Sequence, residues 1–134
     1  MTIRTPLFRK SPESLPFWQA AQEGRLVLPF CPKCDQPHLP VGPVCPFCFS
    51  DLIIFKESSG KGKVSSFTVV HKQWFPDFYR PLPYNVVQVE LTEGPRLMGI
   101  FEEKDIADLT VGANVEVGFK TLTPELTLIV FSPE

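Results

Sequence analysis

The chain has 134 residues, a net charge of −2, and a composition of 43% apolar and 21% charged residues. These values fit one ordinary globular domain or two very small ones, and they exclude an intrinsically disordered chain. No apolar run approaches the roughly 20 residues of a membrane helix. Proline is the outlier at 15 residues, which predicts many turns and short strands in a mainly β fold.

Basic residues are scattered singly or in pairs, with no block that could neutralise a run of phosphates. This pattern weakens the case for non-specific nucleic-acid binding. The first residues, Met1 to Pro6, lack the apolar core of a signal peptide. We therefore expect a cytoplasmic protein, and in that reducing compartment four cysteines are more often metal ligands than disulfides.

Residues 11–24 predict a short helical segment. Ser11 or Ser14 can cap its start, and Gly24 stands where a left-handed residue ends a helix. Proline is tolerated only in first turns, so we expect either two short pieces or one helix that begins near Pro16.

The predicted helix places Phe17, Trp18 and Ala21 along one stripe. Two interpretations stay open. The stripe packs on its own domain, or Phe17 and Trp18 contact a partner, because a helix this short is marginal without something to pack against.

Two short apolar runs flank the four cysteines. Residues 26–28 lead into the first pair and residues 52–55 lead away from the second. These runs predict short strands on either side of two metal-binding turns.

The cysteines form two Cys-X2-Cys pairs separated by ten residues: Cys31, Cys34, Cys45 and Cys48. Each pair can point two sulfurs at one ion from a tight turn, so the pattern predicts a tetrahedral zinc site with Zn–S distances of about 2.3 Å. Four thiolates leave no open position for water or substrate, which makes the predicted zinc structural. Iron in a rubredoxin-like arrangement is the alternative, because the same ligands hold either metal.

From residue 58 onward the pattern predicts a barrel. The expected strands are residues 63–71, 84–91, 96–101, 115–120 and 126–131. A polar connection at 102–112, with room for a helical turn, separates the third strand from the fourth, as in a five-stranded OB-fold. Gly60 and Gly62 mark either a bulge or barrel corner, or a flexible linker.

Catalytic motifs are missing from the sequence. The two histidines, His38 and His71, have no motif around them, and we expect a surface residue and a strand-end residue respectively. No nucleophile elbow, phosphate-binding glycine loop or dinucleotide fingerprint occurs. We therefore expect no catalytic residues and no enzyme that acts alone.

The segment from Trp74 to Tyr84 joins the first two barrel strands and combines five aromatic residues with three prolines. OB-folds carry a ligand-binding loop here. The segment either folds over the core as a plug or contacts a partner protein or acyl ligand. The candidate contact residues are Trp74, Phe75, Phe78 and Tyr79.

Taken in order, these motifs resemble a family of small acyl-CoA-associated proteins, formerly a domain of unknown function, with an N-terminal helix, a rubredoxin-like zinc ribbon and a C-terminal OB-fold. The resemblance covers nearly the whole chain. It depends on Phe17-Trp18, Gly24-Arg25-Leu26, the two cysteine pairs, residues 60–71, Pro83-Tyr84, residues 89–91, Glu93-Gly94, Leu109, Gly112, Val115 and Val117.

The resemblance implies a helical segment at 1–24, a zinc ribbon at 25–57 and an OB-fold barrel at 58–134. It also implies a non-catalytic accessory or scaffold subunit that binds a thiolase-like acyl-CoA enzyme of lipid, steroid or polyketide metabolism and helps to bind the acyl-CoA. The alternative is a single-stranded nucleic-acid-binding module, since zinc ribbons and OB-folds also serve that function.

Overall fold

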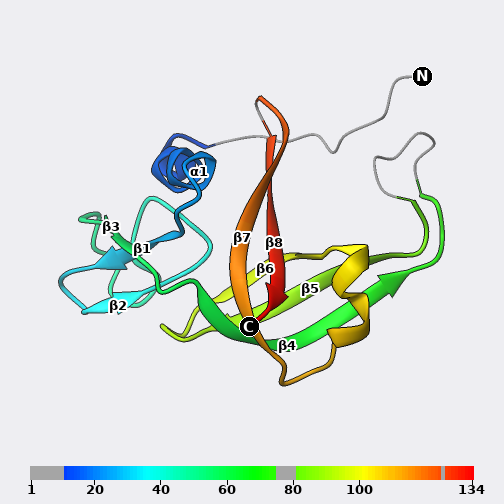
Figure 1. Ribbon diagram of the computed structural model, residues 1–134. Helices are drawn as coiled ribbons and strands as arrows, with labels where there is room; N and C mark the ends of the chain where they lie inside the picture. The colour runs from blue at the N-terminus through cyan, green and yellow to red at the C-terminus, as the bar shows by residue number, and fades with distance from the viewer. Residues whose placement is uncertain (1–10, 75–80, 125) are drawn as a thin grey trace.

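The computed structural model describes residues 11–74, 81–124 and 126–134. It confirms a mainly β fold with a short N-terminal helix, a ribbon and a five-stranded barrel (Figure 1). The elements are η1 (Pro12–Ser14), α1 (Leu15–Gln22), β1 (Val27–Cys31), β2 (Gln36–Pro37), β3 (Ile54–Glu57), β4 (Lys61–Val70), β5 (Tyr84–Leu91), β6 (Arg96–Phe101), η2 (Glu103–Asp108), β7 (Asn114–Thr123) and β8 (Leu126–Pro133).

The N-terminal helical segment forms two short pieces, a 3-10 turn followed by α1. Gly24 follows with φ +80°, the left-handed conformation expected after the helix. The predicted side-chain caps are wrong, because neither Ser11 nor Ser14 caps a helix with its hydroxyl. The Ser14 hydroxyl instead donates to the Ser11 carbonyl at 2.9 Å, so it bonds back to the preceding turn and not to a helix N–H group.

Helix α1 packs on its own chain. Phe17 and Ala21 are buried, and Phe17 belongs to the same apolar core cluster as Val87 and Val89 of β5. Phe17 thus follows the interpretation in which the stripe packs on its own domain, whereas Trp18 is only partly buried. With eight residues, α1 is far too short to cross a bilayer, and no other described helix qualifies.

The ribbon is a three-stranded antiparallel sheet in the order β2-β1-β3. Phe30 of the central strand pairs with Pro37 on one side and Ile54 on the other. All residues of β1 are buried, which explains its continuous apolar sequence.

The barrel closes in the order β4-β5-β6-β8-β7. All pairs are antiparallel except β6 with β8, which meet in parallel where Ile100 and Phe101 pair with Val130 and Phe131. The predicted connection between the third and fourth strands contains the helical turn η2.

Neither of the two glycines at the start of the first barrel strand forms a bulge; Gly60 precedes β4 and Gly62 is its second residue. Gly60 has φ +73°, and a β-carbon at Gly62 would lie 2.7 Å from Cγ1 of Val89, so β4 and β5 approach too closely there for a side chain. The bulge itself lies further on, between Val64 and Ser66.

The barrel core consists of side chains from every strand. The fully or almost fully buried members are Val64, Val87, Val89, Leu91, Phe101, Val115 and Phe131. Both faces of β8 are covered, which explains the two-sided apolar pattern of this strand. Ile129, which shares a face of the strand with Phe131, packs against the core cluster and lies at a pocket beside α1.

A carboxylate joins the ribbon to the barrel. Glu93 accepts a hydrogen bond from the Ser58 hydroxyl at 2.9 Å and one from the Ser59 backbone N–H at 2.8 Å. Burial acts to raise the pKa of Glu93, but these hydrogen bonds outweigh it, and the pKa is lowered. Glu93 therefore holds the connection in place while ionised.

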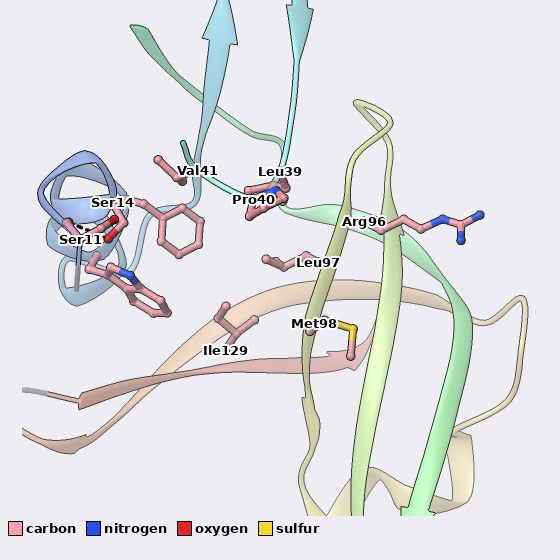
Figure 2. A pocket seen from close by; sticks show the side chains of 11 residues that line it. Ser11, Ser14, Leu39, Pro40, Val41, Arg96, Leu97, Met98 and Ile129 are labelled. Atoms are coloured by element: carbon pink, nitrogen blue, oxygen red, sulfur yellow. Dashed lines mark hydrogen bonds between the residues drawn. The ribbon is translucent and has the colours of Figure 1, made fainter. Parts of the chain in front are cut away.

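A pocket of about 560 Å³ lies where α1, the ribbon and the barrel meet. Most of its lining side chains are apolar: Phe17, Trp18, Leu39, Pro40, Val41, Leu97, Met98 and Ile129. Arg96 stands at the rim and points away from the apolar side chains (Figure 2). The pocket thus presents an apolar surface composed of all three parts of the chain.

Candidate metal centre and contact surfaces

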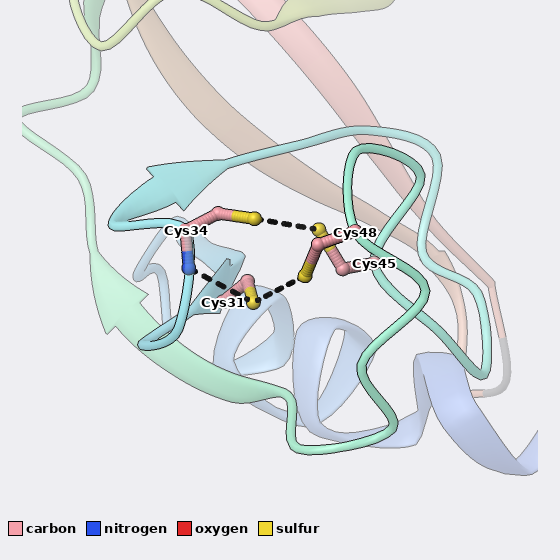
Figure 3. A group of neighbouring side chains, drawn as sticks. All are labelled: Cys31, Cys34, Cys45 and Cys48. Carbon is pink, nitrogen blue, oxygen red and sulfur yellow. Dashed lines mark hydrogen bonds between the residues drawn. The ribbon is translucent and has the colours of Figure 1, made fainter.

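The four cysteine sulfurs lie together at one end of the ribbon (Figure 3). All four are within 4.8 Å of one another, and none forms a disulfide. The Sγ atoms of Cys31 and Cys48 are 3.7 Å apart, and those of Cys34 and Cys45 are 3.9 Å apart. A tetrahedral ion with metal–sulfur distances of about 2.3 Å requires sulfurs about 3.8 Å apart. The cluster is therefore arranged to bind a metal.

Two matching turns position the sulfurs. In the first, the backbone N–H of Asp35 donates to the Cys31 carbonyl at 2.8 Å, and in the second that of Phe49 donates to the Cys45 carbonyl at 2.8 Å. Backbone N–H groups also point at sulfur: those of Cys34 and Phe47 lie 3.4 Å from the Sγ atoms of Cys31 and Cys45. Such donors stabilise thiolate charge.

Both turns end in a left-handed residue that is not glycine. Asp35 has φ 59° and Phe49 has φ 62°. Asp tolerates this conformation well, whereas a bulky aromatic residue rarely adopts it. Phe49 is therefore held in a strained backbone conformation by the turn that positions Cys45 and Cys48.

The thiols differ in acidity. The pKa of Cys48 is lowered to about 7, chiefly by a hydrogen bond from the Cys34 side chain and then by a backbone hydrogen bond at Ser50. The pKa of Cys34 is raised to about 12 through the same contact with Cys48 and through burial. The protons are therefore shared unevenly among the four thiols. A metal that binds four thiolates must displace the protons that the thiols still hold.

His38 lies in the interior, so its prediction as a surface residue is wrong. The residue is only 4% exposed, because the hydrogen bond from its backbone N–H to the Pro29 carbonyl at 3.0 Å holds it beside the buried strand β1. Neither ring nitrogen has a hydrogen-bond partner within residues 11–74, 81–124 and 126–134, and burial lowers the pKa of the imidazole. His38 is not a member of the metal-binding group among the described residues.

The predicted contact residues fall into three groups. Phe17 is buried in the core, and Trp18 lines the pocket beside it. Trp74 is 64% exposed, with the Lys72 ammonium 4.2 Å from its ring centre. The other predicted contact residues, Phe75, Phe78 and Tyr79, lie outside the described residues.

The ribbon carries apolar side chains that the sequence analysis did not single out. Phe49 is 76% exposed, Leu52 61% and Phe47 58%, all within or just after the second cysteine turn. The signal was present in the sequence Cys45-Pro46-Phe47-Cys48-Phe49, because a tight metal-binding turn directs the residues between and after its ligands outward. The pocket could not be found in this way, since its residues come from distant parts of the chain.

Two family models match the chain. Residues 18–53 match the model described as "ChsH2, rubredoxin-like zinc ribbon domain" and residues 55–120 match "ChsH2, C-terminal OB-fold domain". The boundary between the two models falls at the start of β3 (Ile54–Glu57).

Individual relatives are similar over much of the chain. A probable enoyl-CoA hydratase alpha subunit of Thermomonospora curvata is 40% identical over 122 residues, which are 87% of this chain and 36% of that protein. A DUF35 domain-containing scaffold protein of Methanocaldococcus jannaschii is 32% identical over 97 residues, 69% of this chain and 65% of that protein. The chain thus spans about a third of the first relative and just under two thirds of the second.

A solved structure matches more completely. A chain of the structure titled "Ltp2-ChsH2(DUF35) aldolase" superposes with a TM-score of 0.82 and 35% identity, covering 94% of this chain and 98% of that one. This match includes the helix, the ribbon and the barrel in one arrangement.

Proposed function

The chain belongs to the ChsH2-type DUF35 family, and on that basis we propose that it is an accessory, non-catalytic subunit that binds a catalytic subunit acting on acyl-CoA thioesters. The match over almost the full length of a chain in an aldolase assembly carries this proposal. The names "scaffold protein" and "enoyl-CoA hydratase alpha subunit" among the relatives support it. As the catalytic partner we propose a subunit with a thiolase-like fold.

Zinc is the metal we propose for the four-cysteine cluster. The sulfur spacing of 3.7 and 3.9 Å suits a tetrahedral ion, and the zinc-ribbon family model supports the assignment. When bound, the metal supplies stability to the ribbon, because four sulfurs complete its coordination. Cys31, Cys34, Cys45 and Cys48 hold it, and their two turns present the neighbouring side chains on a rigid base.

The partner surface that we propose begins at the second turn. Strained residues persist where the surrounding structure enforces them, and they concentrate at functional sites. Phe49 is both strained and the most exposed large apolar side chain among the described residues. Aromatic residues of this kind anchor protein interfaces. Phe47 and Leu52 extend the apolar area around it.

The pocket beside α1 offers a second contact. We assign Trp18 and the apolar lining to an apolar side chain of the partner or to the acyl portion of its substrate, because few polar groups face this space. Exposed Trp74, four residues after the end of β4, remains a proposed contact as well. Binding single-stranded nucleic acid is not favoured, since none of these relatives carries such a name.

Affinity purification of the full chain from cells that express it natively tests the proposal. We expect a catalytic subunit to co-elute in a fixed ratio and the complex to turn over an acyl-CoA thioester that neither chain processes alone. Recovery of the chain by itself at every salt concentration, or turnover by the purified chain alone, would contradict the proposal. A Cys45→Ser variant, which lacks one metal ligand, tests whether co-elution of the catalytic subunit requires an intact ribbon.

A further inference from the structure

The first barrel strand has one open edge. β4 pairs with β5 along its whole length, from Gly62 to Val70. On the opposite edge it pairs with β7 only over Lys61–Lys63. The last backbone contacts there are made by Val64, whose N–H donates to the Ala113 carbonyl at 3.0 Å and whose carbonyl accepts from the Gly112 N–H at 2.8 Å. Beyond that point, residues 66–70 have no strand beside them on this edge in the part of the chain that the structure describes.

The same segment is also exposed on both faces. Ser66, Phe67, Thr68 and Val69 are all exposed, and the two apolar side chains are each 38% accessible. Figure 1 shows the paired ends of β4 and β5 running out together on the side away from β1–β3 and α1. A two-stranded hairpin without cover is marginally stable in water. This arm therefore lacks the support that the rest of the barrel has.

The open edge carries no protection against pairing. Proteins usually block an edge strand with lysine, proline or a bulge within the strand. Residues 66–70 have the sequence Ser-Phe-Thr-Val-Val, with no charge and no proline, and the bulge precedes them at Val64/Ser66. Aromatic and β-branched residues of this kind favour strand pairing.

We propose that this edge pairs antiparallel with the same edge of a second copy of the chain, about a two-fold axis at Thr68. In that register Phe67 lies opposite the second copy's Val69, and Ser66 lies opposite its Val70. Aromatic–β-branched pairs and Thr–Thr pairs are among the favourable cross-strand combinations. A two-fold interface of this kind closes at the dimer, because each edge is satisfied by the other.

The absence of charge on residues 66–70 fits a second copy as the occupant, because a two-fold axis brings the same uncharged segment of each chain together. The cations that flank the segment, Lys63 and Lys72, lie outside the paired residues 66–70. No like charges therefore meet across the axis. Five residues per strand form a small contact, which places the dimer among weak, concentration-dependent associations rather than obligate ones.

Sedimentation equilibrium of the metal-loaded full chain over a wide concentration range tests the inference. We expect the average mass to rise from the monomer value of 15.1 kDa towards twice that value. Thr68→Lys and Thr68→Glu place like charges opposite each other at the axis, so each variant alone stays monomeric. An equal mixture of the two restores the dimer, because Lys then faces Glu.

The matched control is Thr121→Lys, which changes an exposed threonine on β7 in the other long hairpin. It should dimerise as the unmodified chain does, and circular dichroism verifies that each variant is folded. A mass of 15.1 kDa at all concentrations, loss of the dimer in Thr121→Lys, failure of the mixture to restore it, or growth into species larger than a dimer would each overturn the inference. None of these outcomes bears on binding of a catalytic subunit at the ribbon.

Discussion

The side-chain amide of Asn85 binds both backbone groups of Phe101. The Phe101 N–H donates to Asn85 Oδ1 at 2.8 Å, and Asn85 Nδ2 donates to the Phe101 carbonyl at 3.0 Å. Both residues are buried. Strand β6 pairs with β5 only up to Gly99 opposite Val87, so the amide continues the contact between the two strands where backbone pairing has ended.

Asn85→Leu should therefore destabilise the barrel. Two buried backbone groups lose their partners, at a cost of about 1–3 kcal/mol each, and we expect a total loss of about 3 kcal/mol in the free energy of unfolding. Urea unfolding measures it. An unchanged midpoint for Asn85→Leu would show that water replaces the amide.

Removal of the metal should affect the two parts of the chain unequally. Elemental analysis should find one zinc per chain, and Co²⁺ in its place should give the intense thiolate charge-transfer absorption of a four-sulfur site. Cys45→Ser or chelation should then increase hydrogen exchange throughout β1–β3, because zinc binding supplies on the order of 10 kcal/mol to such small sites.

The barrel strands should keep most of their protection in that experiment, since their core of Val87, Val89 and Phe131 does not involve the sulfurs. Equal loss of protection in both parts would mean that the ribbon and the barrel unfold as one unit.

Acid should destabilise the chain through His38. Its pKa is lowered in the folded state from the ordinary value of 6.5 because the imidazole is buried. The folded state thus favours the neutral ring of His38. The stability that this residue contributes is fully present above pH 6.5 and is lost as the pH falls from there towards the lowered pKa. One proton gives a limiting slope of about 1.4 kcal/mol per pH unit.

His38→Leu should lose this part of the pH dependence and remain at least as stable near pH 7.5, because two unpaired buried nitrogens are removed. Urea unfolding at pH 7.5 and 5.5 measures the difference. His71→Leu, at an exposed site after β4, is the control and should keep the full acid sensitivity. Parallel pH profiles for the wild-type chain and His38→Leu would contradict the prediction.

Phe49→Gly should separate folding from partner binding. Glycine adopts φ 62° without strain, so the variant should gain about 0.5–1 kcal/mol of stability after allowing for the flexibility of glycine in the unfolded chain. If Phe49 anchors the catalytic subunit, affinity for that subunit should drop at least about tenfold. Titration calorimetry with the co-purified partner measures the affinity.

Asp35→Gly is the matched control, because it relaxes the equivalent residue of the first turn, at φ 59°, without removing an apolar side chain. It should leave affinity unchanged. Equal affinity for Phe49→Gly and the wild-type chain would remove Phe49 from the proposed interface.

The metal-binding cysteines and most strands could be predicted from the sequence, because both depend on local spacing. A Cys-X2-Cys turn needs only its own residues to direct two sulfurs, and the expected strand at 84–91 agrees with β5 residue for residue. Turn chemistry likewise predicted the left-handed Gly24. Each of these features depends on residues that lie close together in the sequence.

Packing between distant segments decided the rest. His38 was expected at the surface, yet the pairing of β2 with β1 places it inside; the pocket unites α1, residues 39–41 of the ribbon and Ile129 of β8. The open edge of β4 exists only because β7 leaves that strand after Lys63. Local sequence sets what each segment can form, but solvent exposure and pairing depend on which segments meet, and that is a property of the folded chain alone.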